Sequence, residues 1–193
     1  MSEEAETEGA ANLDWLIPPA VTALVAGAFW FGGSRSGQGL LIGLGALYAL
    51  LGVLAVWRLK SSDELRLLKP RGGDFTFGAL VAAVLYGLAF VFHALVTSPG
   101  EPKQAWVMRV YMLLGDPLSA QRYLVGAAAA VIGLLEELTW RGLVTSALES
   151  KLGLAKGNLA GVLLYAVAHL PTMWLLSDPT AGLNPLLVVA SLG

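Results

Sequence analysis

The stretch that decides the fold is YLVGAAAAVIGLLEELTWRG, residues 123–142, where an uncharged run leads into two adjacent carboxylates and an arginine. The run at 123–135 is apolar enough for the interior of a membrane. A charged side chain at bilayer depth costs about 3 kcal/mol or more, so Glu136, Glu137 and Arg141 together would be expensive without a function. The stretch therefore predicts a membrane helix that carries a reactive cluster.

The composition is typical of a membrane protein. Of the 193 residues, 56% are hydrophobic and only 13% are charged, whereas soluble domains carry about 25% charged residues. The chain has no cysteine, which excludes disulfides, thiolate metal sites and a cysteine nucleophile. Because the 12 Lys and Arg residues are scattered singly or lie in one loop, nucleic acid is not an expected partner.

Uncharged runs mark the expected membrane helices, because about 20 apolar residues are needed to cross roughly 30 Å of hydrocarbon. These runs lie at 15–34, 39–57, 75–97, 123–135 with its continuation into the glutamates, 157–177 and 185–193. Lipid offers no partner to unpaired backbone groups, so each span must be helical. The sequence predicts an all-α, polytopic transmembrane bundle of about six spans. The last run is too short to cross, and we expect the protein to continue past Gly193.

Three regions are expected along the chain. An acidic, mobile tail at 1–14 precedes three spans and an outer interfacial segment at 15–115, and a core at 116–193 carries the reactive cluster. Basic residues gather at 58–71, in the loop after the second span. The positive-inside rule places this loop, and hence the amino terminus, in the cytoplasm. The expected location is a cell membrane, with membrane lipid as a partner.

His169 is the expected partner of the two glutamates. Gly153 is the natural end of their helix, because glycine takes the left-handed cap conformation at least cost. Glu137 lies 16 residues before Gly153, and His169 lies 16 residues after it. An antiparallel hairpin hinged there places both at one depth. We expect the Glu136 carboxylate and the His169 ring within roughly 6 Å of each other, the span of one shared water.

The two carboxylates are expected to have different roles. Glu137 and Arg141 stand at i and i+4, where they can form a buried, structural ion pair. Glu136 is rotated by about 100° from Glu137, onto the side of Trp140, and is left to accept a proton. Tyr165 lies one turn before His169 on the same face and is expected to support the site.

Two short motifs carry a family resemblance. The pattern E-E-x-x-x-R-G at 136–142, followed by an aromatic-x-x-x-His at 165–169, resembles the CPBP family. This family comprises CAAX proteases and bacteriocin-processing enzymes and is also called the abortive-infection family. It usually has Phe at the positions of Trp140 and Tyr165. Its third motif, His-x-x-x-Asn or His-x-x-x-Asp in a later helix, does not occur in this sequence.

The resemblance implies a glutamate-dependent intramembrane endopeptidase. Glu136 would activate the attacking water, His169 would help to position it, and Glu137 and Arg141 would be the supporting pair. The expected substrate is a peptide or protein with a membrane-associated segment, hydrolysed without a covalent intermediate.

Other interpretations stay open at this point. The charges could mark a helix end that leaves the membrane. A non-catalytic relative could act as a membrane chaperone or immunity protein, and a buried Glu and His could relay protons in a transporter, although the sequence has no internal repeat. No cofactor is expected. A metal on Glu136 and His169 is not favoured, because two protein ligands are too few.

Overall fold

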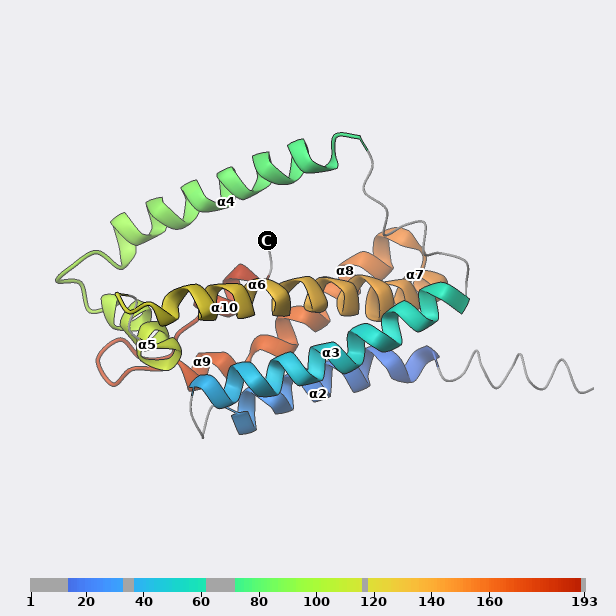
Figure 1. The fold of residues 1–193 in the computed structure, drawn as a ribbon, viewed down its shortest axis with the longest axis horizontal. Helices are drawn as coiled ribbons and strands as arrows, with labels where there is room; N and C mark the ends of the chain where they lie inside the picture. Colours follow the sequence, from blue (N-terminus) through green and yellow to red (C-terminus); the bar gives the residue numbers. More distant parts are fainter. Residues whose placement is uncertain (1–13, 33–36, 62–71, 116–117, 192–193) are drawn as a thin grey trace, which may run out of the picture.

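The protein is a bundle of helices with one helix standing apart from the others (Figure 1). The computed structural model describes residues 14–32, 37–61, 72–115 and 118–191, which are mostly helical and contain no β-strand. The predicted all-α fold is therefore confirmed. The predicted acidic tail lies outside the described residues except for Asp14.

The helices span most of the described chain. Their order is η1 (Asp14–Leu16), α2 (Ile17–Gly32), α3 (Gly37–Ser61), α4 (Asp74–Val96), α5 (Gln104–Leu114), α6 (Gln121–Thr139), the π-helical segment η3 (Trp140–Thr145), α7 (Ser146–Leu152), α8 (Leu154–His169), α9 (Pro171–Leu175) and α10 (Leu186–Ala190). Five stretches of the described chain are long and apolar enough to cross a membrane, namely Asp14–Gly32, Gly37–Ser61, Asp74–Val96, Gln121–Leu152 and Leu154–Leu175. The chain is thus a multi-pass membrane protein.

Helices α2, α3, α6 and α8 form the packed part of the bundle, with α3 along α6 and α2 along α8 (Figure 1). Small residues let these helices approach closely, as is usual where lipid offers no hydrophobic drive between helices. A Cβ atom added at Gly52 would lie 3.2 Å from Leu135, and one at Gly142 would lie 3.2 Å from Ala55. Helix α3 is therefore held close against both α6 and the π-helical segment η3.

The hairpin between α7 and α8 turns at Gly153, as the sequence predicts. Gly153 has a φ of 80°, in the region that favours glycine. Beyond the turn, Gly157 and Gly161 face α7 and η3. Added Cβ atoms would lie only 2.6 Å from the Glu149 backbone and 2.7 Å from the Thr145 hydroxyl, respectively. This close approach brings η3 and α7, which continue α6, alongside α8.

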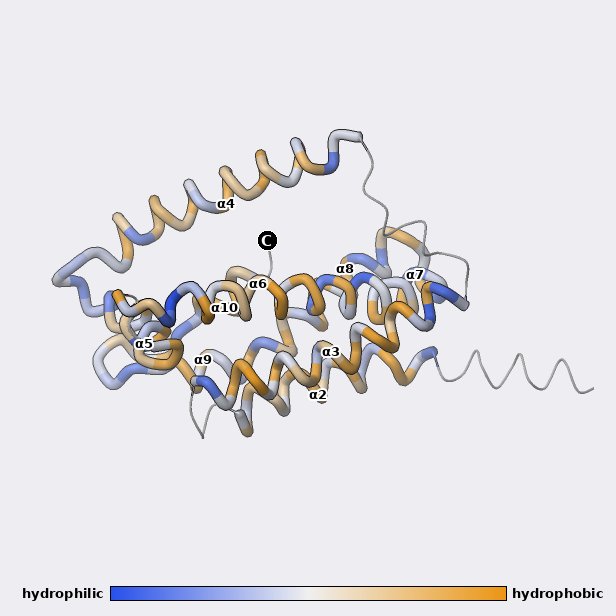
Figure 2. Tube along the Cα trace, viewed as in Figure 1, coloured by the Kyte–Doolittle hydropathy of each residue, from blue (hydrophilic) through white to orange (hydrophobic). Residues whose placement is uncertain are grey.

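Helix α4 makes little contact with the rest of the bundle. Every residue from 74 to 95 is exposed, and Figure 2 shows mainly apolar residues along the helix. Its side chains are suited to lipid on all sides. The helix follows Gly73, which has a left-handed φ of 96°, and Asp74 is its first residue.

Candidate active site

Glu136 and His169 meet in the packed part of the bundle. Glu136 lies near the end of α6, and His169 is the last residue of α8. Glu136 Oε1 lies 3.6 Å from His169 Nε2, and the two side chains are only 20% and 9% exposed. The distance predicted from the equal offsets about Gly153 is therefore confirmed, and the two groups are close enough to share a water molecule.

The hydrogen bond on the far side of the His169 ring fixes what the ring offers to Glu136. His169 Nδ1 lies 2.9 Å from the backbone carbonyl of Tyr165. Since a carbonyl oxygen only accepts, Nδ1 carries a proton, and when the ring is neutral Nε2 presents a lone pair to Glu136. A carboxylate oxygen and an imidazole lone pair both accept hydrogen bonds. A water molecule that donates one hydrogen to each is the simplest group that satisfies both.

Aromatic side chains hold the imidazole in place. The ring centroids of Phe29 and Tyr165 lie 5.1 Å and 4.5 Å from that of His169. Tyr165 also packs edge-on against Trp140, at 5.0 Å, and it lines the same cavities as Glu136. The structure therefore brings Tyr165 to the position beside His169 that the sequence predicts.

Helix α8 ends at His169, and Pro171, two residues later, begins α9. In a continuous helix the Met173 N–H would donate to the His169 carbonyl. Here it donates to the Leu170 carbonyl, so the His169 carbonyl lacks that backbone hydrogen bond. The Thr172 hydroxyl donates to this carbonyl at 2.7 Å. The helix therefore breaks beside the site, and the His169 carbonyl is satisfied by the buried Thr172 side chain.

Tyr48, on α3, is the site residue that the sequence analysis missed. Its hydroxyl donates to Glu136 Oε1 at 2.6 Å, and its side chain is almost fully buried. Trp140 Nε1 lies 3.5 Å from the same hydroxyl, which confirms that Trp140 and Glu136 share one side of their helix. A tyrosine inside the apolar run at 39–57 was the available signal, because a buried phenol needs a hydrogen-bond partner.

Glu137 and Arg141 form the predicted i,i+4 ion pair, but they do not form it in a buried position. The two side chains are 59% and 79% exposed to the surroundings of the bundle. The adjacent positions 136 and 137 diverge by about 100° around the helix, so Glu137 points outward when Glu136 points to His169. The expectation of a buried pair is therefore wrong.

We expect this exposed pair to add little stability. Exposed ion pairs on helices contribute about 0.2–1 kcal/mol, whereas breaking a buried pair costs about 3–5 kcal/mol. In a double-mutant cycle of Glu137→Ala and Arg141→Ala, followed by unfolding of the purified protein, the coupling energy should be about 0.5 kcal/mol. A coupling energy near 3 kcal/mol would show that the pair is shielded from water in the membrane.

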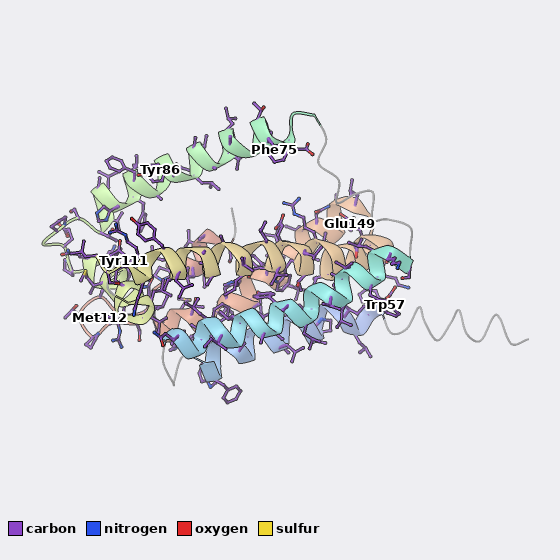
Figure 3. All side chains as sticks on the ribbon, in the orientation of Figure 1. Trp57, Phe75, Tyr86, Tyr111, Met112 and Glu149 are labelled. Atoms are coloured by element: carbon purple, nitrogen blue, oxygen red, sulfur yellow. The ribbon has the colours of Figure 1, made fainter. Side chains whose placement is uncertain are left out.

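Two cavities meet at Glu136 and Tyr165. The inner chamber, of about 250 Å³, is lined by Phe29, Leu44, Tyr48, Ile132, Glu136, Tyr165, His169, Leu187, Ala190 and Ser191. The outer groove, of about 430 Å³, is lined by Gly133, Glu136, Glu137, Trp140, Arg141, Thr145, Glu149, Asn158, Gly161, Val162 and Tyr165. Figure 3 shows Glu149 at the α7–α8 end of the bundle. The mostly apolar chamber therefore adjoins a polar groove that reaches this end.

The same residues offer few ligands to a metal ion. In the described part of the chain, no three His, Asp or Glu side chains gather closely enough to bind one. Glu136 and His169 supply two ligands, and catalytic zinc sites use three from the protein.

These features define a multi-pass membrane protein with a carboxylate–imidazole site between two of its helices. Residues 117–192 match the protein family described as type II CAAX prenyl endopeptidase Rce1-like. The matched segment includes both motifs, at 136–142 and 165–169, and the resemblance to the CPBP family is therefore confirmed. No curated protein and no solved structure matches the chain.

Proposed function

We propose that this protein is an intramembrane endopeptidase that hydrolyses a peptide bond of a membrane-associated substrate. The observation that carries the proposal is the approach of Glu136 Oε1 to His169 Nε2, at 3.6 Å, beside a chamber large enough for part of an extended peptide. The family match at residues 117–192 supports the same reaction class.

In the proposed reaction, a water molecule donates to Glu136 and to His169. Glu136 accepts a proton as the water oxygen attacks the carbonyl carbon of the scissile bond. The C–N bond of the tetrahedral intermediate then breaks, and the proton held by Glu136 passes to the departing amine. In this scheme His169 orients the water through Nε2, while its Nδ1–H remains on the Tyr165 carbonyl. This scheme needs no metal and no cofactor.

The polar groove is the proposed route for water. It joins Glu136 to charged and amide side chains near the α7–α8 hairpin, including Glu149 and Asn158. Lys151 and Lys156 flank the turn of this hairpin, and the positive-inside rule places them in the cytoplasm. We therefore place the protein in a cell membrane with its amino terminus and this hairpin on the cytoplasmic side.

The experiment is a cleavage assay with the full-length protein reconstituted in liposomes. Peptides anchored by a prenylated cysteine or by an apolar helix would be supplied, and the products identified by mass spectrometry. The proposal requires that at least one membrane-anchored peptide is cut and that its free, unanchored form is cut more slowly. Peptide binding without cleavage would instead support a non-catalytic chaperone or immunity protein, and proton uptake into the liposomes would support a transporter.

A further inference from the structure

Tyr48 stands in a directed chain of hydrogen bonds that ends on Glu136. An indole N–H only donates, so the Tyr48 oxygen accepts from Trp140 Nε1, at 3.5 Å. The hydroxyl proton of Tyr48 is then directed to Glu136 Oε1, at 2.6 Å. Trp140 follows Glu136 by one turn on the same helix, whereas Tyr48 comes from α3. The direction of each bond is fixed by the chemistry of its donor.

The packing of α3 makes this contact rigid. Tyr48 is 1% exposed and belongs to the buried core of the bundle. One turn further along α3, Gly52 leaves room for Leu135, the residue before Glu136. The backbones of α3 and α6 are thereby held at the separation that lets the phenol reach the carboxylate. A side chain buried in this way has little freedom to take another rotamer.

The oxygen that Tyr48 contacts is the one that faces the imidazole. Oε1 of Glu136 accepts from Tyr48 and lies 3.6 Å from His169 Nε2. The bond from Tyr48 therefore selects one rotamer of Glu136 out of several that its flexible side chain could adopt. It leaves the remaining lone pairs of the carboxylate available to a water molecule.

We propose that Tyr48 is a positioning residue, which holds the Glu136 carboxylate in the orientation that places its water against His169. This inference rests on the proposed peptidase function. It assigns a role to a residue on α3, outside the segment that matches the family. Tyr48 remains protonated and transfers nothing, and it acts on the substrate only through Glu136.

A second role must be separated from this one, because Tyr48 also lines the inner chamber. A residue that only contacts substrate would change KM, whereas misplacing the base lowers kcat. Tyr48→Phe keeps the ring and removes the donor. Tyr165 remains as a second phenol lining the same cavities as Glu136, so we expect kcat to fall by about 10- to 100-fold, with KM changed less than about threefold.

The matched control is Tyr86→Phe, which makes the same chemical change on the exposed helix α4 (Figure 3). Both variants would be reconstituted as full-length protein and assayed beside the wild type and Glu136→Gln. The melting temperature of Tyr48→Phe should fall by less than about 5 °C, and Tyr86→Phe should match the wild type in both measurements.

An infrared measurement tests the contact without relying on turnover. The difference spectrum between wild type and Glu136→Gln isolates the carboxylate band of Glu136. That band should shift in Tyr48→Phe and stay in place in Tyr86→Phe, because only the first variant loses a hydrogen bond to Oε1.

The outcomes separate the inference from the proposed function. If Glu136→Gln is inactive while Tyr48→Phe keeps the wild-type kcat, or changes only KM, the role of Tyr48 is refuted and the peptidase stands. An unshifted Glu136 band in Tyr48→Phe also refutes it. If the wild type cuts no peptide, the proposed function fails, and a shifted band would still show that Tyr48 orients Glu136.

Discussion

Glu136→Gln should abolish peptide cleavage while leaving the protein folded and inserted in the membrane. Glutamine has nearly the same shape, and its amide oxygen can still accept the hydrogen bond from Tyr48. It cannot accept a proton from water, and Glu137 points away from the chamber. A general base contributes about 100- to 10,000-fold, so the loss in kcat should be at least about 100-fold.

The matched control is Glu101→Gln, which neutralises an exposed carboxylate outside both cavities at Glu136. It should cleave at the wild-type rate in the same liposome assay. Near wild-type turnover by Glu136→Gln would exclude Glu136 as the base. The charges on this helix would then be better explained as a helix end that leaves the membrane.

His169→Ala should lower kcat by about 100-fold or more, because it removes the acceptor that orients the attacking water. The ring is largely buried and has two fixed neighbours, the carbonyl of Tyr165 and the carboxylate of Glu136. The other histidine of these 193 residues is His93.

His93→Ala provides the comparison for this variant. His93 lies on α4, where its ring contacts Thr97 at 2.9 Å, and it lines neither cavity at Glu136. Its removal should leave cleavage unchanged. Equal losses from His93→Ala and His169→Ala, with both proteins folded, would contradict the assignment of His169.

Much of this architecture could be predicted because membrane helices obey simple length rules. Apolar runs located the spans, and one glycine located the hairpin. The equal offsets of Glu137 and His169 about Gly153 then predicted that the glutamates and the histidine meet. Each of these inferences depends on one helix or on two consecutive helices, whose geometry follows from the rise per residue.

The features that could not be predicted depend on packing between helices that are distant in the sequence. Glu136, the hydrogen-bond partner of Tyr48, lies 88 residues away in the sequence. Nothing in the run at 39–57 shows which helix packs against α3. The exposure of Glu137 and Arg141 could not be predicted either, because it also depends on which side of the helix packs against other helices. In a helix that is apolar almost all round, no amphipathic pattern distinguishes the protein-facing side from the lipid-facing side.

The π-helical segment Trp140–Thr145 also has no signature in the sequence. It begins four residues after Glu136, where the Trp140 N–H is shared between the Glu136 and Glu137 carbonyls. Such wide turns are frequent at functional sites, because they re-aim side chains within a continuous helix. Here the segment presents the Trp140 indole to Tyr48.

The most direct test of direct water attack is a single turnover in water labelled with the heavy isotope of oxygen, with enzyme in excess over a membrane-anchored peptide. A base-activated water places the label in the new carboxylate of the product and none in the enzyme. Mass spectrometry of the product, and of the enzyme fragment that contains Glu136, would locate the label. Attack by a water that Glu136 activates should give a labelled product and an unlabelled Glu136. Label in the Glu136 side chain would show a covalent intermediate on that carboxylate and would contradict the account.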